Sequence, residues 1–139
     1  MLDRAEPRLI DLPTVPHALG DLTFIDGART IPFEIRRVFY VCDPPDHAVR
    51  GGHAHKTDRQ VVVALAGSFE VQLETQTGGV HHFQLDKPTR GLYVPPLHWR
   101  TLRRYAPGAV CLVMASEHYD AADYLRDRAS FLAWGRGGP

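Results

Sequence analysis

Short runs of β-branched and aromatic residues, separated by glycine and proline, follow one another along most of the chain. Runs with the length and composition of β-strands occur at 22–26, 33–43, 60–67, 69–75, 80–85, 91–95, 98–104 and 109–116. In the run 69–75 polar and apolar residues alternate, so Phe69, Val71 and Leu73 are predicted to face the core. The run 60–67 has no polar alternation, which predicts a strand covered on both faces. This series of strands and turns predicts an antiparallel sandwich or barrel.

The C-terminal segment 119–134 has a different pattern. Its apolar residues recur at helical spacing, at Leu125, Ala129 and Leu132. Asp120 stands where an N-cap is expected. We therefore predict a short helix that packs on the outside of the barrel, and we interpret Asp120 and Asp123 as helix-capping residues rather than catalytic ones.

The length of 139 residues fits one domain, residues 1–139, with a core at about 20–134. Sixteen basic and sixteen acidic residues give a formal net charge of zero, which argues against binding nucleic acid or a membrane surface through bulk charge. No apolar run reaches transmembrane length. Cys42 and Cys111 lie in apolar stretches without paired spacing, and buried free thiols are typical of a reducing compartment. Without an apolar signal segment at the start, a soluble cytoplasmic protein is expected.

Two histidines stand at the start of the apolar run 60–67, in the sequence "GGHAHK". Residues i and i+2 of a strand point to the same face, so His53 and His55 are predicted to project together. Imidazole titrates close to neutral pH and can both accept and return a proton. Gly51–Gly52 allows the backbone to come close to a neighbouring group. Arg50 and Lys56 flank the pair and favour an anionic ligand such as a phosphate or diphosphate.

A metal site at these histidines lacks further ligands. The spacing resembles the first motif of cupin barrels, but Gln60 stands where the motif has a metal-binding glutamate. Arg100 stands at the place of a further histidine, and a guanidinium has no lone pair to offer a cation. Two histidines without a carboxylate form a poor site for iron, manganese or zinc. No metal is therefore expected, and the remaining alternative to catalysis is that the histidines are ordinary exposed residues at a strand end.

Four segments together resemble a known family: "IPFEIRRVFYV", "RGGHAHK", "GLYVPPLHWR" and "ASEHYDAADYLRD". In this order they are similar to successive motifs of the sugar 3,4-ketoisomerases, metal-free cupin enzymes that act on dTDP-4-keto-6-deoxyglucose. The resemblance runs from about Gly20 to Trp134. It implies an all-β cupin jelly-roll barrel, usually a homodimer, that moves the keto group from C-4 to C-3 through an enediol(ate) without a cofactor.

The resemblance also implies roles for individual residues. His53 and His55 match the proton-transfer pair, and we assign His55 as the base that acts on carbon, with His53 as its partner. Arg37 and Arg50 correspond to arginines that contact phosphate.

Other candidates come from the residue types themselves. Arg100 is a candidate for binding the sugar or the diphosphate, with a salt bridge at the rim as the alternative. Lys56 adds positive charge for the same ligand. Tyr40 and Tyr93 are candidates for stacking on the substrate or bonding to it, although aromatic residues in strands are mostly core. The other functions left open are nucleotide-sugar 3,5-epimerisation, non-catalytic sugar binding, and a metal-dependent dioxygenase or isomerase.

Overall fold

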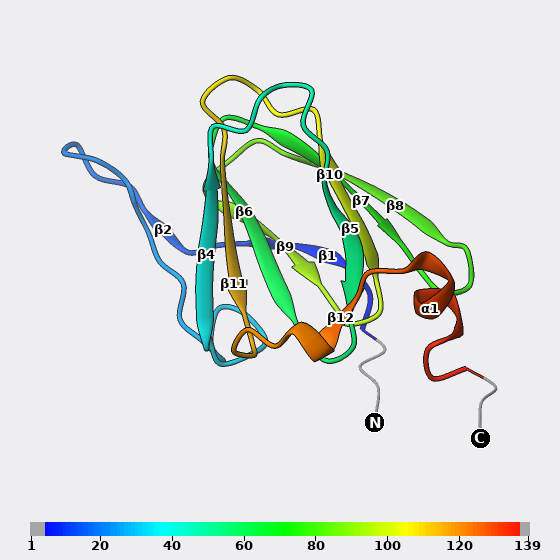
Figure 1. Cartoon of the computed structure of the whole chain (residues 1–139). Helices are drawn as coiled ribbons and strands as arrows, with labels where there is room; N and C mark the ends of the chain where they lie inside the picture. Colours follow the sequence, from blue (N-terminus) through cyan, green and yellow to red (C-terminus); the bar gives the residue numbers. More distant parts are fainter. Residues whose placement is uncertain (1–4, 137–139) are drawn as a thin grey trace.

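Two five-stranded antiparallel sheets face each other and form the body of the molecule (Figure 1). The computed structural model describes residues 5–136, so the ends of the predicted domain, 1–4 and 137–139, lie outside the described residues. The first sheet has the strand order β1-β9-β6-β11-β4, and the second has β12-β5-β10-β7-β8. A separate two-stranded hairpin, β2-β3, projects away from this body (Figure 1). The two facing sheets and the single short helix confirm the predicted all-β class of jelly-roll type.

The predicted strands are present. The elements are β1 (Arg8–Asp11), β2 (Thr14–Val15), β3 (Leu22–Thr23), β4 (Arg37–Cys42), β5 (Arg50–His55), β6 (Gln60–Ala66), β7 (Phe69–Glu74), β8 (Val80–Leu85), β9 (Arg90–Val94), β10 (Trp99–Arg103), β11 (Val110–Ala115), η1 (Ala121–Asp123), β12 (Tyr124–Leu125) and α1 (Arg128–Ala133). Each of the eight predicted runs contains one strand, from β3 and β4 to β6–β11. β1, β2, β5 and β12 lie outside these runs, although the histidine pair on β5 was expected in a strand.

The core lies between the two sheets and follows the alternation of the sequence. Phe69, Val71 and Leu73 on β7 are almost completely buried there, as predicted. In β6 both faces are covered over residues 60–64, because alternate side chains enter two different clusters. The prediction for this strand is wrong only at its end, where Leu65 is half-exposed.

The segment predicted as one helix over 119–134 is divided into three elements: η1, β12 and α1. Asp120 caps η1 by accepting a hydrogen bond from the Ala122 amide. The chain then becomes extended because Tyr124 and Leu125 pair with His55 and Ala54 of β5, which buries Leu125. This tertiary pairing overrides the local helical spacing, and Phe131 is the buried residue of α1.

The two cysteines differ in environment. Cys111 is buried, as expected, whereas Cys42 at the end of β4 is exposed, so the expectation of two buried thiols is wrong for Cys42. β4 is an edge strand whose alternate residues point outward, and Cys42 falls on the outward face. Among the described residues no helix is long and apolar enough to span a membrane.

Candidate active site

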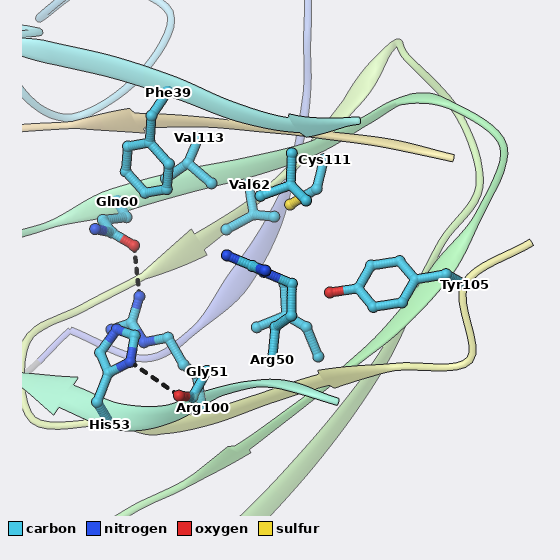
Figure 2. A pocket seen from close by; sticks show the side chains of 12 residues that line it. Phe39, Arg50, Gly51, His53, Gln60, Val62, Arg100, Tyr105, Cys111 and Val113 are labelled. Carbon is cyan, nitrogen blue, oxygen red and sulfur yellow. Dashed lines mark hydrogen bonds between the residues drawn. The ribbon is translucent and has the colours of Figure 1, made fainter. Parts of the chain in front are cut away.

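A cavity of about 110 Å³ lies between the two sheets (Figure 2). The residues that line it are Phe39, Val41, Arg50, Gly51, His53, Gln60, Val62, Arg100, Leu102, Tyr105, Cys111 and Val113. Five of the twelve lining residues are aliphatic or phenylalanine, and charged or hydrogen-bonding side chains occur at a few positions. None of these twelve residues is acidic, while two are arginines, so the lining carries positive charge. The cavity is therefore suited to a ligand with an apolar portion and negative charge.

His53 and Arg100 meet across two neighbouring strands. β5 pairs with β10, and His53 lies directly opposite Arg100 in this register. The ladder shifts at Arg100/Thr101, and Gly51 has a φ of +89° there. A Cβ atom at Gly51 would lie 2.6 Å from the carbonyl oxygen of Arg100. The close backbone approach expected at Gly51 therefore serves the contact with β10.

The imidazole of His53 is in the state that a general base needs. Its Nδ1 lies 3.2 Å from the Gly51 carbonyl oxygen, which can only accept a hydrogen bond. Nδ1 therefore carries the proton, and the Nε2 lone pair is free to accept another. Burial, followed by the positive charge of Arg100, lowers the pKa of His53 to about 4. The ring is thus neutral at pH 7.

His55 projects to the same side as His53, as predicted, with 5.0 Å between the ring centroids. It does not line the cavity, and its side chain is only 1% exposed. Its Nδ1 lies 3.1 Å from Asp123 Oδ2, and its Nε2 lies 3.4 Å from Gln60 Nε2. Burial, followed by the charge of Arg100, lowers the pKa of His55 far below its ordinary value. A neutral His55 thus donates from Nδ1 to Asp123 and accepts from Gln60 at Nε2.

Tyr124 packs against both imidazoles. Its ring centroid lies 4.9 Å from that of His53 and 4.3 Å from that of His55. The guanidinium of Arg126 also lies over the Tyr124 ring, 4.3 Å from its centroid. The tyrosine therefore limits the rotation of both histidines.

Asp123 is the carboxylate that orients His55. Its Oδ2 accepts from His55 Nδ1 and from the Asp58 amide, at 3.1 and 3.2 Å. Its Oδ1 accepts from the Thr57 amide and hydroxyl, at 2.8 and 2.7 Å. The prediction of a capping role is confirmed for Asp120 and wrong for Asp123, because the turn of η1 directs Asp123 toward β5.

Asp58 is a second carboxylate beside His55 and is almost completely buried. Its oxygens accept from the Ser116 hydroxyl, the Glu117 amide, Gln60 Nε2 and Arg37 Nη2. Asp58, Asp123 and His55 each offer a ligand atom within 4.8 Å of the others. The premise that no carboxylate accompanies the histidines is therefore wrong. Each carboxylate oxygen of the pair accepts hydrogen bonds from protein groups.

Arg100 is held by Gln60, the residue at the place of the cupin glutamate. Its Nη1 donates to Gln60 Oε1 at 2.5 Å (Figure 2), while Nε and Nη2 are buried without a partner. Burial lowers the pKa of Arg100 to about 10, so it remains charged at pH 7. Arg100 is therefore a buried cation with free donors rather than part of a salt bridge at the rim.

The other predicted binding residues are divided between the cavity and the rest of the molecule. Arg50 lines the cavity and is exposed, which places it at the opening. Arg37 forms a salt bridge with Asp58, at 3.2 Å, and does not line the cavity.

The remaining three lie elsewhere. The ammonium of Lys56 is 4.3 Å from the ring centroid of Trp134. Tyr40 is exposed on the outer face of β4, whereas Tyr93 is buried in a cluster beneath the first sheet, with Arg8 over its ring.

Sequence reasoning missed four residues of the site: Asp58, Asp123, Tyr105 and Tyr124. Asp123 and Tyr124 belong to the segment "ASEHYDAADYLRD", whose resemblance to a family motif was the available signal. Nothing in the pattern around Asp58 or Tyr105 separates these residues from ordinary loop and strand-end residues.

Comparison with known proteins gives relatives over nearly the whole chain. A curated TDP-4-oxo-6-deoxy-alpha-D-glucose-3,4-oxoisomerase of Aneurinibacillus thermoaerophilus is 36% identical over 126 residues, which are 91% of this chain and 90% of the relative. The crystal structure of QdtA, a sugar 3,4-ketoisomerase of Thermoanaerobacterium thermosaccharolyticum in complex with TDP, is 36% identical with a TM-score of 0.88 and 91% of each chain covered. WlaRB, a TDP-quinovose 3,4-ketoisomerase of Campylobacter jejuni, is 34% identical with a TM-score of 0.87, covering 91% of this chain and 96% of WlaRB.

The family model described as FdtA (WxcM-like, C-terminal) matches residues 5–136. This match contains both sheets, the cavity and the histidine pair. It also agrees with the resemblance to sugar 3,4-ketoisomerases found in the sequence. The chain belongs to the FdtA family.

Proposed function

We propose that this protein is an isomerase that moves the keto group of TDP-4-keto-6-deoxyglucose from C-4 to C-3. The observation that carries the proposal is a neutral imidazole, His53, beside a buried guanidinium with free donors, Arg100, in a cavity without acidic groups. The relatives named for this reaction support the choice of substrate.

In the proposed reaction His53 Nε2 removes the proton from C-3, which the neighbouring carbonyl makes acidic. The electron pair of the broken C–H bond forms a C-3–C-4 double bond, and the negative charge moves to the oxygen on C-4. The proton of the C-3 hydroxyl passes to that oxygen, and His53 returns its proton to C-4. The C-3 carbon is oxidised and the C-4 carbon reduced within one molecule, so the reaction needs no external oxidant or reductant.

Arg100 stabilises the oxyanion, because its Nε and Nη2 are buried donors that have no partner in the protein. His55 has the supporting role, which reverses the assignment made from the sequence. Both of its nitrogens are engaged by Asp123 and Gln60, and only His53 lines the cavity. His55 fixes Gln60, and Gln60 fixes Arg100.

We further propose that no metal takes part. The charged guanidinium of Arg100 lies beside His53 and Gln60 and repels a metal ion there. The oxygens of Asp58 and Asp123 already accept hydrogen bonds from protein groups. Treatment with a strong chelator should leave the rate unchanged. Loss of activity that is restored by one divalent metal would contradict this.

The test of the proposed function is incubation with TDP-4-keto-6-deoxyglucose in D₂O, followed by proton NMR of the product. We expect a carbonyl at C-3 and deuterium at C-4, the carbon to which His53 returns the proton. His53→Asn should abolish both. Inversion at C-5 without movement of the carbonyl would identify a 3,5-epimerase instead. Binding of the sugar nucleotide with no exchange at any carbon would identify a non-catalytic binding protein.

We propose that the partner of this chain is a second copy. The β2-β3 hairpin projects from the body (Figure 1) and exposes apolar side chains, among which Leu19 is 92% exposed. Val38 and Tyr40 are also exposed, on the outer face of the edge strand β4. Apolar surface of this kind favours burial against another protein.

Light scattering at micromolar concentration should therefore give twice the mass of the 15.6 kDa chain. Leu19→Glu should reduce that mass to one chain, whereas Leu65→Glu, at a half-exposed position outside the hairpin, should not. A monomeric wild-type protein would contradict the proposal. We also propose a cytoplasmic location, which the unpaired Cys42 and Cys111 support and which cell fractionation tests.

A further inference from the structure

Tyr105 places a hydroxyl group in the cavity that the reaction described above does not use. The residue follows β10, and its ring packs on Phe69 of β7 with 5.5 Å between the centroids. The side chain is only 3% exposed, yet its hydroxyl has no hydrogen-bond partner. Figure 2 shows this hydroxyl pointing toward Arg50, which lines the same cavity.

An unpaired buried hydroxyl destabilises the folded state, because it loses its hydrogen bonds to water without replacing them. Phenylalanine would make the same ring contact with Phe69 without that loss. The hydroxyl of Tyr105 is thus a group that folding does not require. Burial also raises the pKa of Tyr105 to about 12, so the phenol keeps its proton at neutral pH and can donate a hydrogen bond.

The position of the hydroxyl indicates which part of a ligand it meets. In Figure 2 His53 and Arg100 lie at one end of the cavity and Tyr105 at the second end, with the Arg50 side chain between them. Arg50 is exposed, so the second end is the opening. A cavity of about 110 Å³ is too small for a whole nucleotide sugar, so the phosphate on C-1 must lie at the opening.

We propose that the Tyr105 hydroxyl, together with Arg50, binds an oxygen of the sugar-linked phosphate of a nucleoside diphosphate sugar. This proposal rests on the proposed function, in which His53 and Arg100 contact the hexose at C-3 and C-4. The hydroxyl donates to a phosphate oxygen, and the guanidinium supplies the charge. A hydrogen bond to a charged acceptor is among the stronger kinds.

The test is the variant Tyr105→Phe, titrated by calorimetry with TDP and with TMP. TDP keeps the phosphate that carries the sugar, whereas TMP lacks it. We expect Tyr105→Phe to weaken TDP binding about tenfold and to leave TMP binding unchanged. Tyr119→Phe, which removes a phenol outside the cavity, is the matched control and should change neither value. Equal weakening of TDP and TMP, or no weakening of TDP, would overturn the proposal.

Thermal unfolding of the free protein separates this role from a structural one. Tyr105→Phe should melt at the same temperature as the wild type or higher, since it removes an unpaired group. A clear drop in melting temperature would assign the hydroxyl to folding and overturn the proposal.

A second variant tests the pairing with Arg50. Arg50→Gln combined with Tyr105→Phe should weaken TDP binding by less than the product of the two single effects, because both groups bind one phosphate. A fully multiplicative effect would contradict the shared contact. These binding assays do not need turnover, so a protein that discriminates TDP in this way but fails to isomerise the ketosugar would refute only the proposed function.

Discussion

The substitution Asp123→Asn tests whether a carboxylate orients the histidine pair. Four donors converge on this side chain, two on each oxygen. An asparagine has one oxygen and one NH₂ group, so only one pair of donors keeps its acceptor. The less costly orientation turns the amide oxygen toward the buried His55, because the exposed Thr57 can bond to water instead.

The magnitude follows from that orientation. Leaving a buried donor unsatisfied costs about 1–3 kcal/mol, and solvent compensates part of the loss at Thr57, so we expect a destabilisation of about 2 kcal/mol. Domains of this size unfold at about 5–15 kcal/mol, so the variant should remain folded. In metal sites, mutation of a carboxylate that orients a histidine lowers metal affinity or activity about 10- to 100-fold. We expect a fall of that size in kcat for Asp123→Asn. KM should change little, because Asp123 does not line the cavity.

Urea denaturation and the NMR turnover assay measure the two effects. Asp120→Asn is the matched control, since Asp120 lies three residues earlier and only caps η1 through one hydrogen bond to the Ala122 amide. It should cost about 1 kcal/mol or less and leave kcat unchanged. The reasoning fails if Asp123→Asn behaves like Asp120→Asn in both measurements.

Three further outcomes are expected. The pKa of His53 is about 4 in the folded protein and 6.5 in the unfolded chain, so the unfolded state takes up the proton first as the pH falls. The stability that a neutral His53 contributes is therefore complete above pH 6.5 and is lost as the pH falls toward 4. His53→Asn should remove this part of the pH dependence of unfolding. Arg100→Met should raise the pKa of His53 above 4, yet keep it below 6.5 because burial remains the larger cause; NMR titration of the free protein measures this, and an unchanged or lower pKa refutes it. Phe131→Ala should destabilise the protein by about 3–5 kcal/mol in thermal unfolding, because Phe131 is the fully buried side chain of α1; a change below about 1 kcal/mol would contradict its anchoring role.

The parts of the fold that sequence predicted correctly are those governed by local alternation. The side chains of β7 reach the core because the period of a strand is two residues, and the same rule places His53 and His55 on one side of β5. The helix predicted over 119–134 is present only at Arg128–Ala133, because Tyr124 and Leu125 are extended and pair with His55 and Ala54 of β5. That pairing joins segments about seventy residues apart, and local spacing carries no information about it.

The same limit applied to the site. Asp123 is separated from His55 by 68 residues and Asp58 from Arg37 by 21, so the roles of His55 and Arg37 were assigned without these carboxylates. Arg37 was matched to an arginine that contacts phosphate, but its anionic partner in the structure is the buried carboxylate of Asp58, at 3.2 Å. A buried charge is stabilised by any geometrically suitable counterion, and chemistry alone does not distinguish a protein carboxylate from a substrate phosphate.

Gln60 shows why an amide occupies the place of a metal-binding glutamate in this chain. One end of its side chain accepts from Arg100, while the other donates to Asp58 and to His55. Only an amide offers an acceptor and two donors in this arrangement. A glutamate at this position would pair with Arg100 but would set a second carboxylate against Asp58 and leave His55 Nε2 without its donor. A site that holds a guanidinium rather than a metal ion beside the base therefore requires an amide, not a carboxylate, at position 60.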